Sequence, residues 1–119
     1  MVYFSPILIV FAFLTPPDYD LFGVGPKDQY MYFTASWCGY CNTKANKDYI
    51  AGLKKKPGWS VGEKPDDDFR IVDCDQNANL VSKYNIKSIP YVIRVRKDGT
   101  FVSGSSFDSG KGFEKILEK

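Results

Sequence analysis

The sequence predicts a single α/β domain whose central mixed β-sheet is flanked by helices. Apolar patterns follow the order strand, helix, strand, helix, hairpin and final helix. With 44% hydrophobic and 25% charged residues, the composition is that of a globular protein. Because no repeat or long linker divides the chain, residues 1–119 are expected to form one domain.

The first apolar run, residues 7–14, has two interpretations. Its β-branched and aromatic residues, ended by a turn signal, are typical of a buried first strand in a cytoplasmic protein. Its length also fits a targeting segment of an exported or membrane-tethered protein, although no Lys or Arg precedes it. Residues 15–18 predict the start of a helix. This helix has at most two turns, because Gly23 and Gly25 follow.

The middle of the chain predicts a strand, a helix and a loop. Residues 30–34 are almost entirely apolar, which favours a central strand covered on both faces. A helical stripe then begins at Cys41 and continues through Ala45, Tyr49 and Leu53 to a Lys-Pro-Gly stop at residues 54–58. Residues 59–68 predict a surface loop. Within it, Trp59 either folds back onto the preceding helix or belongs to a docking loop.

The second half predicts a strand, a short helix, a hairpin and a last helix. The strand is expected at residues 69–74 and the short helix at 80–84. The hairpin is expected to pair residues 91–96 with 101–107 around a turn at 97–100. The last helix is expected at residues 113–117, with Ser109 as its cap.

Charge and residue usage exclude several function classes. Sixteen basic and fourteen acidic residues give a net charge of +2, too weak to predict nucleic-acid binding. The absence of histidine removes Ser-His-Asp and Cys-His catalysis and any His-ligated metal. Three cysteines cannot complete a four-thiolate zinc site, so no metal is expected.

Cys38 and Cys41 form a CxxC motif between the buried strand and the helix. This spacing brings two sulfurs within bonding distance, and a helix N-terminus stabilises a thiolate placed at it. Cys41 belongs to the apolar stripe and is expected to be buried, whereas Cys38 is expected to be exposed. We therefore expect Cys38 to attack and Cys41 to resolve, with Cys74 as a structural thiol.

Two stretches then resemble the thioredoxin superfamily over roughly residues 27–119. Residues 33–41 match an aromatic strand followed by a WCxxC motif, and residues 83–90 match the segment that ends in the cis-proline. The resemblance implies a thioredoxin-like fold with Pro90 in cis beside the cysteines. It also implies dithiol–disulfide oxidoreductase activity in electron transport and redox homeostasis, with no cofactor besides a redox-active disulfide.

The same resemblance predicts a substrate-binding surface. Because Pro90 has no N–H, the polar backbone groups of Ile89 are left free to pair with an extended substrate. Trp37, Gly39 and Tyr40 would complete the surface around the reactive sulfur.

The chain also departs from the family pattern. Tyr32 stands where thioredoxins keep a buried acid, and Ile71 stands where a lysine usually accompanies it. The dipeptide between the cysteines is Gly39-Tyr40 instead of Gly-Pro. Loss of that proline leaves an N–H able to point at the Cys38 sulfur and to favour its thiolate.

The resulting hypothesis is an oxidoreductase that exchanges protein disulfides through Cys38 and Cys41. Its partners would be protein disulfides or dithiols and an external reductase or thiol donor, and we expect a monomer with neither nucleic-acid nor membrane partners. A non-catalytic thioredoxin-fold binding module and a glutathione-dependent, glutaredoxin-like exchanger are the alternatives.

Overall fold

The computed structural model describes residues 28–117. The strand or targeting segment expected at residues 7–14 and the helix start expected at 15–18 lie outside the described residues. Within 28–117, no helix is long and apolar enough to cross a membrane. The elements are β1 (Gln29–Thr34), α1 (Lys44–Lys54), β2 (Val61–Gly62), β3 (Phe69–Asp73), α2 (Ala78–Lys83), β4 (Tyr91–Val95), β5 (Phe101–Ser106), the 3₁₀ turn η3 (Asp108–Gly110) and α3 (Lys111–Ile116).

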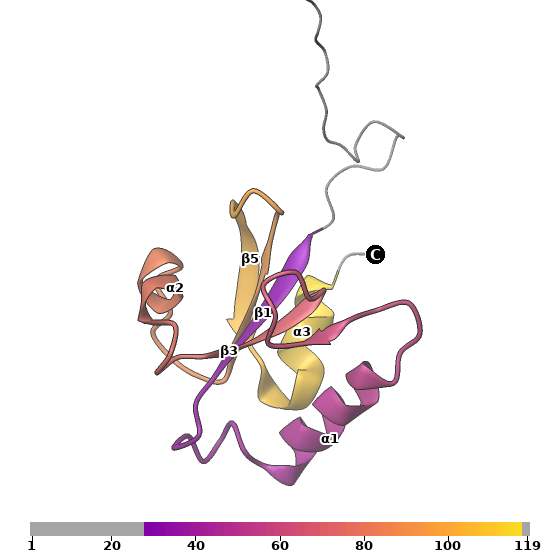
Figure 1. The fold of residues 1–119 in the computed structure, drawn as a ribbon. Helices are drawn as coiled ribbons and strands as arrows, with labels where there is room; N and C mark the ends of the chain where they lie inside the picture. Colours follow the sequence, from indigo (N-terminus) through magenta and orange to yellow (C-terminus); the bar gives the residue numbers. More distant parts are fainter. Residues whose placement is uncertain (1–27, 118–119) are drawn as a thin grey trace, which may run out of the picture.

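A five-stranded sheet with the order β2-β3-β1-β4-β5 forms the centre of the fold (Figure 1). Strand β1 runs parallel to β3 and antiparallel to β4, and β4 and β5 form the antiparallel hairpin. The four inner residues of β1 are buried. The expectation of a mixed sheet with a central, doubly covered strand is therefore confirmed.

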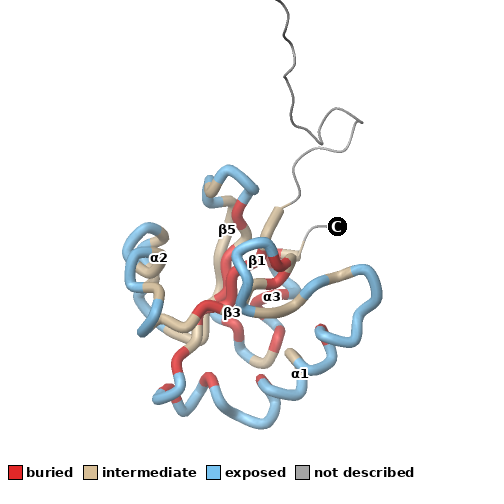
Figure 2. Tube along the Cα trace, viewed as in Figure 1, coloured by how far each residue is buried: buried red, intermediate tan, exposed pale blue. Residues whose placement is uncertain are grey.

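Helices cover both faces of this sheet, with α2 on one side and α1 and α3 on the other (Figure 1). The alternation of β1 divides the core accordingly, because successive side chains of a strand point to opposite faces. Tyr30 and Tyr32 join the core beneath α1 and α3, whereas Met31 and Phe33 join the core beneath α2. Buried residues follow the strands, and the outer helix faces are exposed (Figure 2).

Trp59 packs into the core under α3. Its ring centroid lies 5.9 Å from those of Phe69 and Phe113 and 6.2 Å from that of Tyr30. The Lys56 ammonium, just beyond α1, lies 5.2 Å from the indole centroid. The folded-back interpretation of Trp59 is thus supported, and the ring fastens the loop to the sheet as well as to the end of the helix.

The loop after Trp59 is not entirely irregular. Val61 and Gly62 form β2, which pairs in parallel with β3, so the expectation that residues 59–68 form only a surface loop was wrong at these two residues. A Cβ on Gly62 would lie 2.7 Å from the Asp67 carboxylate, which accepts a hydrogen bond from the Lys64 N–H. Two residues are too few for an alternating pattern to reveal a strand.

Helix α1 begins later than the apolar stripe predicts. It starts at Lys44, and the Thr43 side chain caps it by accepting a hydrogen bond from the Asn46 N–H. Since Cys41 lies in the preceding turn and not in the helix, counting every fourth residue from it does not give the buried face of α1. Ala45 is exposed, and Asn46 faces the core instead.

The entry into α3 also differs from expectation. Ser109 does not cap the helix; Gly110 occupies the cap position at φ 95°, a left-handed conformation suited to glycine. The Ser109 N–H instead donates to the Asn46 side chain at 2.8 Å. Gly112 sits directly on β5, where a Cβ would overlap the Ser106 carbonyl oxygen.

Candidate active site

The cysteine pair lies in a turn between β1 and α1. The Cys38 N–H donates to the Ala35 carbonyl, and the Asn42 N–H donates to the Gly39 carbonyl, each at 3.2 Å. The Asn42 side-chain amide adds a 2.7 Å hydrogen bond to the Cys38 carbonyl. These bonds fold the motif into a compact turn without helical structure.

Cys38 and Cys41 are joined by a disulfide, with their Cα atoms 5.2 Å apart. The Cys41 N–H donates to Cys38 Sγ at 3.1 Å, so an amide hydrogen points at the first sulfur. The hydrogen bond to the sulfur therefore comes from the Cys41 N–H and not from the Tyr40 N–H that the missing proline was expected to leave. Within residues 28–117, no hydrogen bond is directed at Cys41 Sγ.

The expectation that Cys38 is exposed was wrong for this oxidised form. Cys38 is 6% exposed and Cys41 is 3% exposed. Both are covered because Ala35 and Ile89 pack against them. The start of α1 at Lys44 also places Cys38 outside the first turn of the helix, so the Cys41 amide, rather than the helix dipole, is the close positive partner of Cys38 Sγ.

Ile89 brings a second chain segment to the sulfur. The Ile89–Pro90 peptide bond is cis, and the Ile89 carbonyl oxygen lies 4.0 Å from Cys38 Sγ. The two motifs singled out in the sequence, 51 residues apart, thus meet at one point. Ile89 is half-buried and packs against the cluster formed by Ala35, Cys38 and Cys41.

Two large aromatic side chains stand exposed around the pair. Trp37 is 68% exposed and Tyr40 is 81% exposed. The Trp37 indole N–H donates to the Asp75 carboxylate at 3.0 Å, which holds the ring beside the motif. Gly39, between them, has no atom within 4 Å of where a Cβ would lie, so this part of the turn is open.

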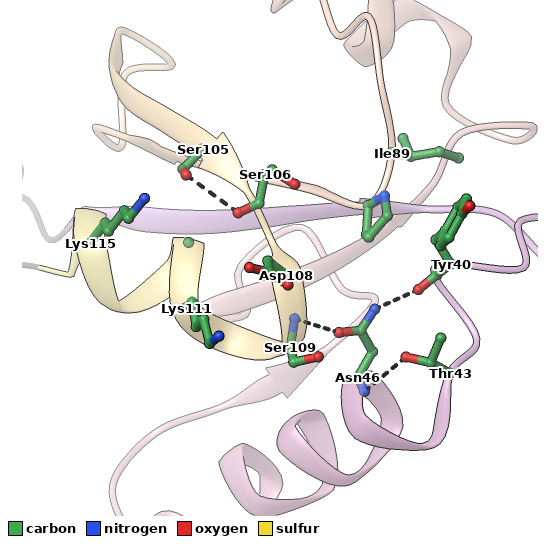
Figure 3. Close-up of a pocket in the computed structure, with 12 residues that line it drawn as sticks. Tyr40, Thr43, Asn46, Ile89, Ser105, Ser106, Asp108, Ser109, Lys111 and Lys115 are labelled. Atoms are coloured by element: carbon green, nitrogen blue, oxygen red, sulfur yellow. Dashed lines mark hydrogen bonds between the residues drawn. The ribbon is translucent and has the colours of Figure 1, made fainter.

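Asn46 is a site residue that the sequence reasoning placed on the polar side of the helix. It is 3% exposed, and its amide donates to the Tyr40 carbonyl at 2.7 Å while its oxygen accepts from the Ser109 N–H (Figure 3). One side chain thereby connects the CxxC turn to η3. The available signal was Thr43, because threonine is a favoured N-cap residue. A helix that begins after Thr43 does not include Cys41, so the spacing counted from Cys41 does not predict its buried face.

Tyr32 and Ile71, the two departures from the family pattern, are direct neighbours across β1 and β3. Tyr32 is 2% exposed, with its ring stacked on Phe69 and 4.5 Å from Phe107. Burial raises the pKa of its hydroxyl, and the Thr34 side chain opposes this without reaching hydrogen-bond geometry. A buried tyrosine and an isoleucine, neither of them charged, therefore occupy these two positions.

The third cysteine is not part of the disulfide. Cys74 is a free, half-buried thiol packed against the core beneath α2. Burial, followed by the charges of Asp73 and Asp75, raises the pKa of its thiol. Within the described part of the chain, no group of three or more His, Cys, Asp or Glu side chains could hold a metal ion.

A vicinal cysteine pair closing a disulfide beside a cis X-Pro bond, on an α/β sheet, defines a thiol–disulfide oxidoreductase. The Thioredoxin family model matches residues 25–118. The chain therefore belongs to the thioredoxin family, and the resemblance inferred from its motifs is confirmed.

Solved structures agree with this assignment. A thioredoxin from Fasciola hepatica is 32% identical, covering 76% of this chain and 79% of its own, with a TM-score of 0.55. Mitochondrial thioredoxin 3 from Saccharomyces cerevisiae is 21% identical, covering 74% of each chain with a TM-score of 0.53, and supports the fold. No curated protein sequence matches the chain.

Proposed function

We propose that Cys38 is the attacking cysteine and Cys41 the resolving cysteine of this oxidoreductase. The supporting observation is the 3.1 Å hydrogen bond from the Cys41 N–H to Cys38 Sγ. A hydrogen bond to the charged form of a group favours that form, so the reduced protein would hold Cys38 as a thiolate more readily.

The reaction follows from this asymmetry. The Cys38 thiolate attacks one sulfur of a substrate disulfide, forming a mixed disulfide and expelling the other substrate sulfur as a thiolate, which takes a proton from solvent. The Cys41 thiol loses its proton and attacks Cys38 Sγ. That step closes the Cys38–Cys41 disulfide and releases the second substrate thiolate. Two electrons pass to the substrate, and an external dithiol donor returns the pair to its reduced state.

The surface around Cys38 supports an extended protein substrate. Trp37 and Tyr40 are exposed aromatic side chains, and large apolar side chains in the open are characteristic of docking surfaces when they gather at one point. The Ile89 carbonyl near Cys38 Sγ would pair with a backbone N–H of the substrate. Gly39 and Pro90 complete this surface by leaving the approach open.

The experiment is insulin disulfide reduction with dithiothreitol as electron donor, measured for the parent chain and two variants. Cys38→Ser is expected to abolish turnover, and Cys41→Ser is expected to accumulate a covalent adduct through Cys38, identified by mass spectrometry. An adduct through Cys74, or turnover retained by Cys38→Ser, would contradict the assignment. Absence of turnover in the folded parent chain would favour a binding module, and turnover of a glutathione mixed disulfide alone would favour glutathione-dependent exchange.

A further inference from the structure

A hollow of about 490 Å³ begins at the redox site and continues away from it (Figure 3). Tyr40, Ile89 and Pro90 line its near end. Strand β5 contributes Ser105 and Ser106 to one wall, and α3 contributes two lysines at the far end. Its volume is in the range of ordinary ligand pockets, so it can hold several side chains of a bound chain.

The two lysines, Lys111 and Lys115, give this end of the hollow positive charge. They are four residues apart on α3 and therefore lie on the same side of the helix. Both are exposed, and within residues 28–117 the ion pairs involve other lysine and arginine residues. Their charges are thus available to a ligand.

Acidic groups near the hollow do not cancel this charge. Asp108 is the acidic side chain among the described residues that line it, against two lysines. Glu114, on the same helix, does not line the hollow, and its carboxylate accepts a hydrogen bond from the Tyr49 hydroxyl at 3.1 Å. The Ser105 hydroxyl donates to the Ser106 carbonyl, so the lining carries one net positive charge together with the hydroxyls of Ser106 and Ser109, which can donate to a carboxylate.

We propose that this hollow binds the polypeptide segment flanking the substrate's disulfide cysteine, and that Lys111 and Lys115 select acidic side chains in that segment. The inference rests on the proposed function, because it requires the substrate sulfur to meet Cys38. A polypeptide is the occupant because the hollow starts at Ile89, whose free backbone suits an extended chain, and continues beyond the reach of the cysteine itself. Charge complementarity then sets the preferred sequence.

The test uses two synthetic peptides, each carrying one cysteine as a mixed disulfide with a chromogenic thiol. One peptide has glutamates on both sides of the cysteine, and the other has glutamines at the same positions. Release of the chromophore by the protein, kept reduced by a dithiol donor whose direct reaction with the peptide is subtracted, gives kcat and KM. The parent chain is expected to favour the glutamate peptide through a lower KM with an unchanged kcat.

Two lysine variants and a control locate the effect. Lys111→Gln and Lys115→Gln are each expected to raise KM for the glutamate peptide about two- to fivefold, the range of an exposed ion pair, without changing KM for the glutamine peptide. Lys54→Gln, at the exposed end of α1 and outside the hollow, removes the same charge and is expected to change neither. The preference is expected to vanish near 1 M salt, where the screening length falls to about 3 Å.

Each other outcome has a distinct meaning. Equal KM values for the two peptides in the parent chain would overturn the proposed selectivity while leaving the exchange activity in place. Absence of chromophore release from both peptides would instead overturn the proposed function. A glutathione mixed disulfide that is used more efficiently than the glutamate peptide, with the same dependence on Lys111 and Lys115, would show that the hollow serves a small thiol and would overturn the polypeptide occupant.

Discussion

Asn46→Ala tests whether one buried amide holds the redox turn in place. The substitution removes the hydrogen bonds to the Tyr40 carbonyl and from the Ser109 N–H, at 2.7 and 2.8 Å. Each such bond contributes about 1 kcal/mol net, and water can partly replace both because they are only part-buried. We therefore expect a loss of about 2 kcal/mol, which corresponds to a Tm about 8–16 °C lower for a domain of this size.

The measurement is urea or thermal unfolding of the oxidised protein, followed by circular dichroism. Lys47→Ala is the matched control, since Lys47 is the adjacent, exposed residue of α1 and reports the gain in helix propensity alone. Loosening the Tyr40 carbonyl is also expected to shift the equilibrium of the Cys38–Cys41 pair against glutathione, whereas the control leaves it unchanged. If Asn46→Ala and Lys47→Ala unfold at the same urea concentration, the amide does not connect the turn to η3.

Three further predictions follow from single contacts. Gly112→Ala is expected to cost at least about 3 kcal/mol in urea unfolding, because the new Cβ overlaps the Ser106 carbonyl, whereas Gly52→Ala, with open space around it, is expected to be stabilising. Tyr32→Phe is expected to keep or raise stability, since a buried hydroxyl outside hydrogen-bond geometry costs about 1–3 kcal/mol; a clear loss would show that the hydroxyl is bonded. After reduction, Cys74 is expected to react with iodoacetamide more slowly than Cys38 at pH 7 and faster as the pH rises, because its pKa is raised; labelling of Cys74 before Cys38, read by mass spectrometry, would contradict this.

The sequence was most informative where a pattern was long or chemically constrained. Residues 30–34 were predicted as a central strand and residues 69–74 as a strand, and they are β1 and β3 with boundaries within one residue. The Lys-Asp-Gly-Thr turn at 97–100 fixed the hairpin of β4 and β5. Spacing alone located the Cys38–Cys41 pair, and the match at residues 83–90 located the segment that meets it.

The features that the sequence did not predict, such as the buried face of α1, depend on tertiary contacts. The period-four stripe led from Cys41 to Ala45, but the turn at the motif is not helical, so the buried face of α1 begins at Asn46. A polar residue is buried there because two backbone groups, the nearby Tyr40 carbonyl and the distant Ser109 N–H, satisfy its amide. Pattern reasoning assigns asparagine to solvent unless those partners are known.

The described chain organises the redox pair through backbone groups and neutral side chains. The donor on Cys38 Sγ is an amide N–H, and the turn is held by the amides of Asn42 and Asn46. Beneath it, Tyr32 packs among aromatic rings opposite Ile71, where a carboxylate would have to be desolvated at considerable cost. Because burial raises the pKa of Tyr32, its phenol stays protonated near neutral pH and cannot accept the Cys41 proton. The aromatic packing thus stabilises the sheet, and under the roles proposed for the two cysteines a base other than Tyr32 receives the proton when the mixed disulfide resolves.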